Sequence, residues 1–468
     1  MKKRTKIVAT IGPASERVET LSAMLEAGLN VARMNFSHGS HDEHGGRFAA
    51  FRAAMQKTGI PGGILQDLSG PKIRIGDFSS ESIELTPGKE FVITTEEVIG
   101  DENRVSISYT ELPQHVHKGT RIMLNDGKNE LHVNAVEGNN IRTTVVTGGT
   151  IRGRRGVNVP GAYLPIKSFT EKDKKDAEFG IAQGVDYIGL SFVRTAEDIQ
   201  DARALLALKN SPAQIIAKIE TQEAMEHLDA IIEVADGIMV ARGDLAVEIP
   251  PEQVPLAQKN IIARCMQVGK PVIVATHMLE SMIDSPVPTR AEVSDVSNAV
   301  LDGTDAIMLS AESTLGKYPV EAVQTMTAIA ETAEASGICR ACTVSGESAT
   351  STDTVTEAIM HAAQRGHAKY IIALTETGST ARMLTRFRLP QEIIAFTPHP
   401  HAFRQLVLSY GCRPVLSKPL TSLEEALHEV RTHLLSSKIA AVGDTVVVAA
   451  GMPFGKTGST NMLLLETL

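Results

Sequence analysis

Eight short apolar runs recur along the chain, and most are separated by stretches with apolar residues at three- and four-residue spacing. That spacing is typical of amphipathic helices, and buried strands that alternate with helices indicate parallel βα units. Eight units are the number that an α/β protein of the (β/α)8 TIM-barrel class requires, although strand counting alone leaves an open doubly wound sheet as the alternative. The runs are Thr5–Gly12, Val31–Ser37, Gly63–Leu68, Val185–Phe192, Gln214–Glu220, Gly237–Asp244, Pro271–Thr276 and Asp305–Ser310.

The third and fourth runs are more than a hundred residues apart, which is too long for one crossover. The gap holds short runs bounded by Gly, Asn and Asp, which indicate antiparallel strands. We therefore expect a small β-barrel lid domain at residues 70–167, inserted over the face where barrel enzymes keep their sites, with the catalytic barrel at 1–69 and 168–337. The short runs are Ser82–Leu85, Glu90–Thr95, Arg121–Leu124, Glu130–Val136, Asn140–Val146 and Arg155–Val159.

A second βα series begins after a segment rich in Ser, Thr, Ala and Gly at Gly337–Thr354. It predicts a smaller, open α/β domain at residues 338–468. Its expected strands are Tyr370–Thr375, Ile393–Thr397, Arg413–Leu416 and Thr445–Ala450.

Composition excludes several classes of function. The net charge is −9, Trp is absent and aromatic residues make up 4% of the chain, which argues against nucleic acid and anionic membranes as partners. No apolar run approaches the ~18 residues of a membrane span, and the apolar stretch Ile7–Ile11 is too short for a signal peptide. Four Cys fit a reducing compartment, so we expect a cytoplasmic protein.

Charged side chains stand near the ends of runs that should be apolar if buried. Residues two apart on a strand share a side, and a buried charge costs several kcal/mol unless it is paired or binds an ion. A structural layer of ion pairs inside the barrel is the alternative to a functional site. The groups that share a side are Lys218 with Glu220, Arg33 with Asn35 and Ser37, and Arg242 with Asp244.

Glu220 and Asp244 are carboxylates at the ends of neighbouring predicted strands. A small number of oxygen ligands suits Mg²⁺ or Mn²⁺, which keep waters and are completed by substrate oxygens. Lys218, Arg33 and Arg74 add positive charge at the same rim if the barrel closes. A divalent metal with these cations is the electrostatic set that phosphoryl transfer needs.

Five stretches together resemble the signature sequences of the pyruvate kinase family, in its bacterial form. The resemblance runs from Lys6 to the C-terminus and implies the same division into barrel, lid and C-terminal regulatory domain. It further implies phosphoryl transfer from phosphoenolpyruvate to ADP, giving pyruvate and ATP in the final step of glycolysis, by an allosteric homotetramer. The stretches are Arg33–Gly39, Lys218–Glu220, Met239–Leu245, Pro288–Glu292 and Leu301–Asp305.

The resemblance also implies roles for particular residues. Lys218 would stabilise the phosphoryl group in transit, Arg33 would bind it, and Glu220 with Asp244 would hold the metal ion. The substrate carboxylate would be bound by Gly243, Asp244 and Thr276. The relay that protonates the enolate would include Thr276, Ser310 and Glu312. The nucleotide would face Thr10, Pro13, Asn35, Phe36, Ser37, His38, Arg74 and Arg155.

Lys72 departs from a common pattern of the family, which has Glu at this position together with a bound K⁺. Lys72 resembles the potassium-independent branch, because an ammonium can supply the charge of the ion, so we expect that K⁺ is not required. A solvated hinge lysine is the alternative. The monovalent-cation position would be formed by Asn35, Ser37, Asp67 and the Leu68 carbonyl.

Three further departures concern single residues. Arg155 stands where the family has a lid lysine, and the two side chains differ in reach and geometry. His277 replaces a usual Gln after Thr276, which would make the relay sensitive to pH unless the side chain serves packing alone. Asn125 replaces the first Asp of a lid turn whose Asp-Gly remains.

A loop rich in hydroxyls between a strand and a helix of the C-terminal domain is a candidate anion site. By resemblance it would bind a phosphorylated small-molecule effector, and a capped turn without a ligand is the alternative. Cys339 and Cys342 form an isolated Cys-x-x-Cys, which we interpret as two ordinary thiols. The effector residues would be Thr375, Thr377, Gly378, Ser379, Thr380, Gly455, Gly458 and Ser459.

Two other functions are compatible with parts of the pattern. A Mg²⁺-dependent barrel lyase acting through an enolate would share the carboxylate pair, but it has no need of a lid or a nucleotide site. A metabolite sensor that has lost turnover would not need Lys218, Glu220, Asp244 and Thr276 together. Dependence of pyruvate formation on ADP separates the kinase from the lyase.

Overall fold

The computed structural model describes residues 3–339, 350–455 and 460–468. Its centre is a closed barrel of eight parallel strands in the order β1-β16-β15-β14-β13-β12-β3-β2, which confirms the barrel and rules out the open sheet. The strands are β1 (Lys6–Thr10), β2 (Val31–Asn35), β3 (Gly63–Asp67), β12 (Tyr187–Leu190), β13 (Gln214–Ile219), β14 (Gly237–Ala241), β15 (Val272–Ala275) and β16 (Ala306–Leu309).

Helices surround this barrel, because each strand must be covered on its outer face. Side chains of β1 and β2 such as Ile7 and Ala32 pack with Leu21 of α1 and Phe48 of α2 in one large outer core. The helices of this part are α1 (Val18–Ala27), α2 (His41–Thr58), α4 (Glu171–Ala182), α5 (Glu197–Leu208), α6 (Gln222–Glu226), α7 (Leu228–Val234), α8 (Arg242–Glu248), η1 (Pro251–Gln253), α9 (Val254–Gln267), η2 (Glu280–Ile283), α10 (Arg290–Leu301), α11 (Ala311–Thr314) and α12 (Pro319–Ala335).

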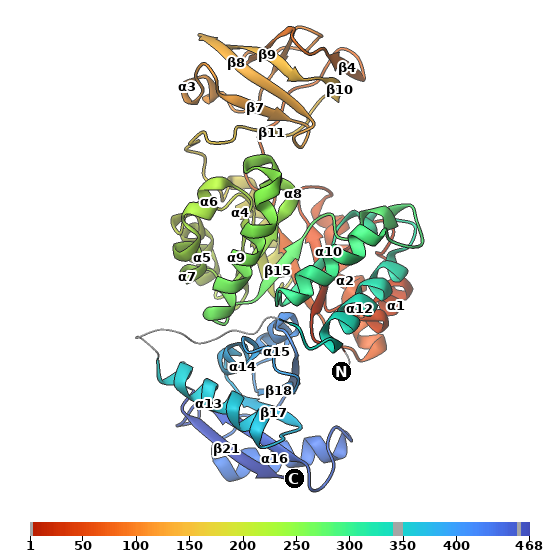
Figure 1. The fold of residues 1–468 in the computed structure, drawn as a ribbon, viewed down its shortest axis with the longest axis vertical. Coiled ribbons are helices and arrows are strands. Elements are labelled where there is room, and N and C mark those ends of the chain that lie inside the picture. The colour runs from red at the N-terminus through yellow and green to blue at the C-terminus, as the bar shows by residue number, and fades with distance from the viewer. Residues whose placement is uncertain (1–2, 340–349, 456–459) are drawn as a thin grey trace.

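The insertion between β3 and α4 forms its own β domain at one end of the molecule (Figure 1). Six strands pair in the order β11-β7-β8-β9-β5-β6, and β10 pairs with β4. Residues 73–76 hydrogen-bond to both edges of the six-stranded sheet, through Arg155 and Val157 on one side and Ser106 and Ser108 on the other. The expected small barrel is therefore closed by this short segment. The elements are β4 (Ser82–Leu85), β5 (Glu90–Thr94), β6 (Arg104–Ser106), α3 (Leu112–His115), β7 (Arg121–Leu124), β8 (Asn129–Glu137), β9 (Asn140–Thr147), β10 (Gly149–Arg152) and β11 (Val157–Asn158).

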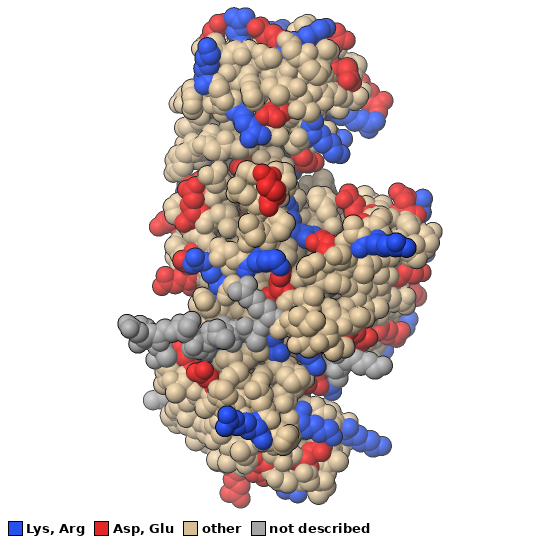
Figure 2. Space-filling model, in the orientation of Figure 1, with Lys and Arg blue, Asp and Glu red and all other residues tan. Residues whose placement is uncertain are grey.

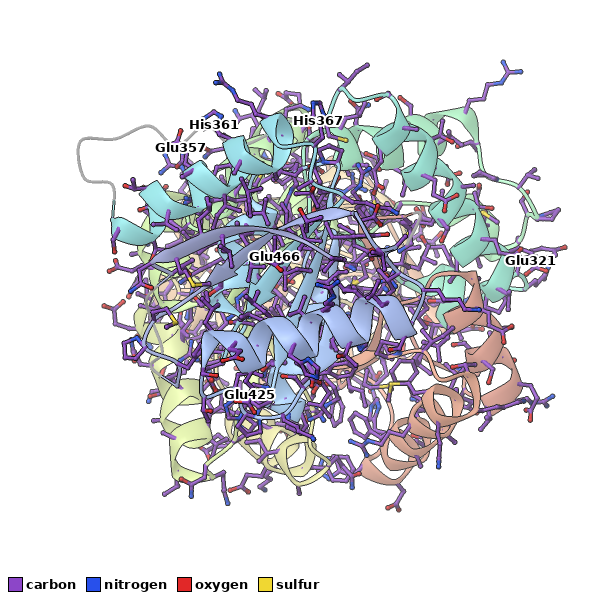
Figure 3. The ribbon with its side chains drawn as sticks, turned by 90° about the horizontal axis from the view of Figure 1, so that it is seen from below. Glu321, Glu357, His361, His367, Glu425 and Glu466 are labelled. Carbon is purple, nitrogen blue, oxygen red and sulfur yellow. The ribbon has the colours of Figure 1, made fainter. Side chains whose placement is uncertain are left out.

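The C-terminal domain lies at the opposite end (Figure 1) and is an open sheet in the order β19-β18-β17-β20-β21. Alternate residues of β17 pack on two sides, Ile371 against Ile359 of α13 and Ile372 against Val430 of α16. Figure 3 shows α13, with Glu357 labelled, and α16 on opposite sides of the sheet. The elements are α13 (Ser351–Arg365), β17 (Tyr370–Leu374), α14 (Ser379–Thr385), β18 (Glu392–Thr397), α15 (Pro400–Gln405), η3 (Leu406–Leu408), β19 (Cys412–Leu416), α16 (Leu423–Ser436), β20 (Thr445–Ala450) and β21 (Met462–Thr467).

Buried polar contacts join the C-terminal domain to the barrel at the start of the barrel strands. Arg388 Nη2 lies 2.8 Å from Asp305 Oδ2, and both side chains are almost fully buried. Arg404 Nε lies 2.7 Å from Asp186 Oδ1, and Lys6 Nζ donates to the Cys412 carbonyl at 2.8 Å. These contacts lie at the amino ends of β1, β12 and β16, so this seam holds the barrel from that end.

Acidic and basic side chains are interspersed over the face drawn in Figure 2, without a large basic patch. Among the helices that the structure describes, none is both long and apolar enough to cross a membrane. The strand pattern of the sequence was incomplete at three places: β6, β10 and the antiparallel edge strand β21 were not expected.

Candidate active site

Four neighbouring barrel strands, β2, β3, β12 and β13, bring their carboxyl ends together. Arg33 and Asp67 lie on the ends of β2 and β3, Ser191 follows β12, and Lys218 and Glu220 lie at the end of β13. Residues separated by up to 187 positions in the sequence therefore form one charged cluster.

Asp67 is the centre of this cluster. Its Oδ2 accepts hydrogen bonds from Arg33 Nε at 2.7 Å and Nη2 at 2.6 Å, and its Oδ1 lies 3.2 Å from Lys218 Nζ. Burial alone would raise the pKa of the Asp67 carboxyl, but Lys218 and Arg33 outweigh it and lower the pKa. Asp67 is therefore a carboxylate that holds two cations side by side.

Lys218 is the most closely surrounded cation of the site. Its Nζ lies 3.0 Å from Glu220 Oε1 and donates to Ser191 Oγ at 2.7 Å. Burial would lower the pKa of Lys218, yet the nearby carboxylates of Asp67 and Glu220 raise it above its ordinary value. The side chain is consequently an ammonium at neutral pH, held in place by three oxygen-bearing groups.

Ser191 was missed by reasoning from the sequence. Its hydroxyl accepts from Lys218 and donates to the Leu68 carbonyl at 2.7 Å, so it links Lys218 to the end of β3. The next residue, Phe192, has a left-handed φ of 55° and donates its backbone N–H to Glu220 Oε2 at 2.7 Å. The available signal was position alone, since both residues directly follow a barrel strand.

Glu220 is a buried carboxyl with a second carboxylate nearby. Burial raises its pKa, Lys218 opposes this, and the negative charge of Asp244 raises the pKa further. A buried carboxyl whose ionisation is disfavoured by burial and by a neighbouring carboxylate fits a divalent cation, whose charge would favour the ionised form. Within the described ranges no three His, Cys, Asp or Glu residues form a metal-binding group. Two carboxylates are a small donor set of the kind that Mg²⁺ or Mn²⁺ completes with water and substrate oxygens.

The loop after β15 is held in a strained conformation beside the start of α8. Thr276 and His277 have left-handed φ values of 71° and 54°. Arg242 donates to the Thr276 carbonyl at 2.7 Å and forms a bidentate ion pair with Asp295, at 2.6 and 2.7 Å. This support places the Thr276 hydroxyl 2.8 Å from the Gly243 amide, which donates to it.

Glu312 and Ser310 lie together after β16. Glu312 is buried, and its two oxygens accept the backbone N–H groups of Ser310 at 2.6 Å and Leu279 at 3.1 Å. Glu312 therefore ties the loop after β16 to the loop after β15. In this geometry its carboxylate supports the two loops that carry Ser310 and Thr276.

The candidate nucleotide residues of the barrel lie beside Arg33. Thr10 Oγ1 accepts from Arg33 Nη1 at 2.8 Å, and Asn35 Oδ1 accepts from the Ser37 amide at 3.1 Å. Pro13 and His38 are exposed, whereas Phe36 is buried. The barrel therefore brings this group to the rim next to the charged cluster.

The other candidate nucleotide residues belong to the inserted domain. Arg74 donates to the Arg154 carbonyl at 3.0 Å, and Arg155 is exposed on the wall that includes Asn125. Lys72 Nζ lies 3.7 Å from Asp126 Oδ1, so its ion pair is made within the inserted domain.

Lys72 pairs with Asp126, whereas other cations contact Asp67 of the expected monovalent-cation position. The cations on Asp67 are Arg33 and Lys218, and the Leu68 carbonyl accepts from Ser191.

The side chain of His277 is not packed in the interior. It is 63% exposed and lies 3.9 Å from Glu280, which argues against the packing interpretation.

The expected effector residues surround a pocket in the C-terminal domain. Thr375 Oγ1 accepts from the Gly378 amide at 2.9 Å, and Thr380 Oγ1 lies 2.9 Å from Thr460 Oγ1. Gly378 has a left-handed φ of 85° directly before α14. Gly458, Ser459 and Cys342 lie outside the described residues. Those of the expected residues that line the pocket are Thr375, Thr377, Ser379, Thr380 and Gly455.

Comparisons with known proteins agree with this arrangement. Residues 2–323 match the family model "Pyruvate kinase, barrel domain", and residues 353–465 match "Pyruvate kinase, alpha/beta domain". The chain is 45% identical to a pyruvate kinase of Geobacillus stearothermophilus over all of this chain and 81% of the relative. It is 44% identical to one of Clostridium acetobutylicum, with 99% of each chain covered.

A solved structure gives the same result for the fold. The crystal structure of a pyruvate kinase from Cryptosporidium parvum matches with a TM-score of 0.93 and 34% identity, covering all of this chain and 96% of the other. The lyase and sensor alternatives find no support in these matches. The chain belongs to the pyruvate kinase family, and as a phosphotransferase it converts phosphoenolpyruvate and ADP into pyruvate and ATP.

Proposed function

We propose that phosphoryl transfer takes place at the Arg33–Asp67–Lys218–Glu220 cluster. The carrying observation is the buried Lys218 ammonium, held 3.0 Å from Glu220 and 3.2 Å from Asp67. Arg33 and Lys218 then face the phosphoryl group from two neighbouring positions, and their charge opposes the negative charge that spreads over its oxygens during transfer.

Asp244 and Glu220 would hold the divalent ion, which when bound supplies positive charge to the phosphoryl and enolate oxygens. The Gly243 and Asp244 amides and the Thr276 hydroxyl bind the substrate carboxylate at the start of α8. The bond between phosphorus and the enol oxygen breaks, and a bond from phosphorus to a β-phosphate oxygen of ADP forms. The enolate left behind takes a proton at carbon through the relay of Thr276 and Ser310, whose loops Glu312 holds together.

The decisive experiment replaces Lys218 by Met. Phosphoryl transfer is expected to fall by about a hundredfold to a thousandfold, since one such electrostatic contact contributes ~3–4 kcal/mol. Mn²⁺ binding, followed by electron paramagnetic resonance, should persist because both carboxylates remain. Lys209→Met is the matched control, since Lys209 is an exposed lysine paired with Glu178. Near-normal turnover of folded Lys218→Met would refute the role.

We infer that the enzyme does not require K⁺. Asp67 Oδ2, the Leu68 carbonyl and Asn35 Oδ1 of the expected cation position already accept from protein donors, and the Lys218 ammonium lies 3.2 Å from Asp67 Oδ1, which supports this. Arg33 and Lys218 supply positive charge at Asp67, while Lys72 acts from the lid side. Rates in tetramethylammonium buffer should change less than about twofold when K⁺ is added, a free-energy difference below ~0.4 kcal/mol. Strong activation by K⁺ would overturn the inference.

We propose further that the C-terminal pocket binds a phosphorylated small-molecule effector. The converging hydroxyls of Thr375, Thr377 and Thr380 support an anionic ligand. A ligand screen that follows half-saturation for phosphoenolpyruvate tests this, with Thr377→Val as the site variant. An unchanged half-saturation with every sugar phosphate and nucleotide monophosphate would favour the capped-turn alternative.

The remaining proposals concern context. We propose that the protein is cytoplasmic and forms a homotetramer. Light scattering of the purified protein tests the oligomeric state directly. We also propose the domain division 1–69 with 168–337, 70–167 and 338–468, which limited proteolysis at the two lid connections and at the last boundary tests.

A further inference from the structure

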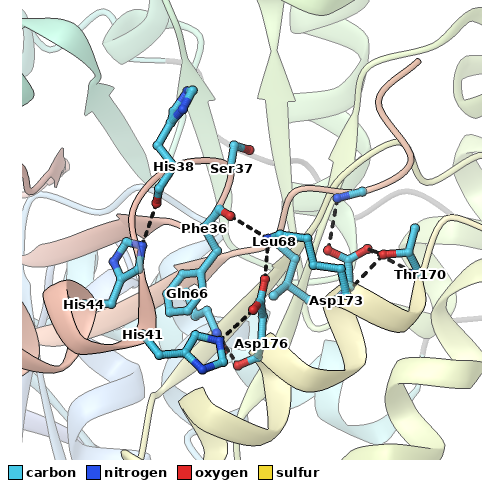
Figure 4. A network of polar contacts seen from close by, with 12 residues as sticks. Phe36, Ser37, His38, His41, His44, Gln66, Leu68, Thr170, Asp173 and Asp176 are labelled. Atoms are coloured by element: carbon cyan, nitrogen blue, oxygen red, sulfur yellow. Dashed lines mark hydrogen bonds and ion pairs between the residues drawn. The ribbon is translucent and has the colours of Figure 1, made fainter. Parts of the chain in front are cut away.

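The loop Asn35–His38 is supported from behind by helices α2 and α4 (Figure 4). Lys172 Nζ, in the first turn of α4, donates to the Phe36 carbonyl at 2.9 Å. His44 Nε2, on α2, donates to the His38 carbonyl at 2.8 Å. Two alternate carbonyls of the loop are thus held on the side of the helices, and in Figure 4 the Ser37 and His38 side chains point away from α4.

Asp176 is a buried carboxylate that the phosphoryl-transfer site does not use. Its Oδ2 lies 2.6 Å from Lys172 Nζ, and its Oδ1 lies 2.7 Å from His41 Nε2. Its backbone carbonyl accepts from Gln66 Nε2 at 2.6 Å, one residue before Asp67 on β3. Asp176 therefore fixes the direction of the Lys172 ammonium and attaches α4 to the strand that carries the central carboxylate.

His44 is held in a single protonation form by its surroundings. The ring stacks on Phe36 with centroids 3.9 Å apart, and its Nδ1 is buried without a hydrogen-bond partner. Burial lowers the pKa of His44, so the neutral ring carries its proton on Nε2, where the His38 carbonyl accepts it. The Asn35–His38 loop thus receives hydrogen bonds from one charged donor, Lys172, and one neutral donor, His44.

The same turn of α4 also holds the first lid connection. Asp173 Oδ1 accepts from the Gly70 amide at 3.1 Å, while its Oδ2 accepts from Thr170 in the helix cap. Gly70 has a left-handed φ of 65°, and a Cβ there would lie 2.9 Å from Ser191 Cβ. The start of α4 is therefore a common support for the Asn35–His38 loop and for the hinge of the lid.

We propose that Lys172, oriented by Asp176, is a positioning residue that sets the backbone of the Asn35–His38 loop for binding the nucleotide diphosphate. The inference rests on the proposed role of that loop in nucleotide binding. In this role Lys172 acts through the Phe36 carbonyl and not on a substrate directly. Helix α4 also contacts the lid connection, because Asp173 accepts from the Gly70 amide.

The test measures KM for ADP and for phosphoenolpyruvate separately in Lys172→Met. Loss of one charge-assisted hydrogen bond at a largely exposed lysine should raise KM for ADP about two- to fivefold. KM for phosphoenolpyruvate and kcat should change less than about twofold, because the Lys218 cluster does not involve α4. Lys172→Arg should restore most of the ADP affinity, since its guanidinium can reach the same two acceptors.

Lys174→Met is the matched control, because Lys174 lies on the same helix and pairs with Glu171, three residues earlier on its surface. His38→Ala distinguishes the nucleotide-binding role of the Asn35–His38 loop from the positioning role of Lys172. If His38→Ala and Lys172→Met both leave KM for ADP unchanged, the nucleotide role of the loop is wrong. If only His38→Ala raises it, or if Lys172→Met raises both KM values equally, the positioning role of Lys172 is refuted.

Discussion

Replacing Asp67 by Asn tests the electrostatic centre of the site, because it removes the carboxylate that holds two cations together. Arg33 makes contacts of 2.7 and 2.6 Å to Oδ2, Lys218 lies 3.2 Å from Oδ1, and Asp67 is 1% exposed. Breaking a buried ion pair by removing one partner costs about 3–5 kcal/mol. Because an amide oxygen can still accept from Arg33, we expect a loss near the lower end, about 3 kcal/mol in free energy of unfolding.

Anions should partly reverse this loss. In Asp67→Asn the Arg33 and Lys218 cations lose the carboxylate that lies between them, so inorganic phosphate should bind the variant more tightly than the wild type. Ligand binding to the folded state stabilises it in proportion to the logarithm of ligand concentration over Kd. In urea unfolding, the difference in free energy of unfolding between the wild type and Asp67→Asn should therefore shrink as the phosphate concentration rises.

The pH dependence follows from the same carboxyl. The pKa of Asp67 in the folded protein lies below its ordinary value, so its contribution to stability is complete above that value, about 3.9, and is lost as pH falls through the lower folded pKa. The stability difference between wild type and Asp67→Asn should stay constant from pH 8 to pH 5.

The control is Asp201→Asn, since Asp201 lies 3.6 Å from Lys167 on the exposed surface. An exposed pair contributes at most about 1 kcal/mol. The reasoning would be refuted if Asp67→Asn lost no more stability than this control, or if phosphate stabilised both Asp67 forms equally.

Three further substitutions test contacts elsewhere. Ser191→Ala removes the hydroxyl between Lys218 and the end of β3, and should lower kcat by about tenfold without unfolding the protein; steady-state kinetics and circular dichroism check both parts. Gly70→Ala forces a side chain into a left-handed position against Ser191, at a cost of about 1–3 kcal/mol, and should speed proteolysis at the lid connection. Arg388→Met leaves Asp305 buried without its cation and should lower the free energy of unfolding by about 3–5 kcal/mol, measured by urea denaturation; a change below 1 kcal/mol would contradict it.

The sequence pattern located the barrel strands because parallel strands are buried on both faces and leave continuous apolar runs. The same logic located Arg33, Lys218 and Glu220, since charge is conspicuous at the end of such a run. It missed Ser191, because a neutral hydroxyl after a strand carries no comparable signal. It also did not indicate the partner of Lys72, because spacing along the chain does not state that its ammonium pairs with Asp126.

The unexpected strands were missed for related reasons. β6 and β10 are short and largely polar, so they lack the apolar alternation that indicates a strand. β21 lies at a sheet edge, where only part of its surface is buried, and it follows a glycine-rich segment. Long-range supports such as Lys172 behind the Phe36 carbonyl depend on where α4 lies relative to the loop after β2, which no local pattern encodes.

The central claim is that Glu220 and Asp244 together hold the divalent ion beside Lys218. Crystals grown with Mn²⁺ and phosphoenolpyruvate, measured at the manganese absorption edge, test it directly. The account predicts an anomalous peak bonded to one oxygen of Glu220 and one of Asp244, at a metal–oxygen distance of roughly 2.0–2.2 Å. A manganese peak bound elsewhere, with both carboxylates free of metal, would contradict it.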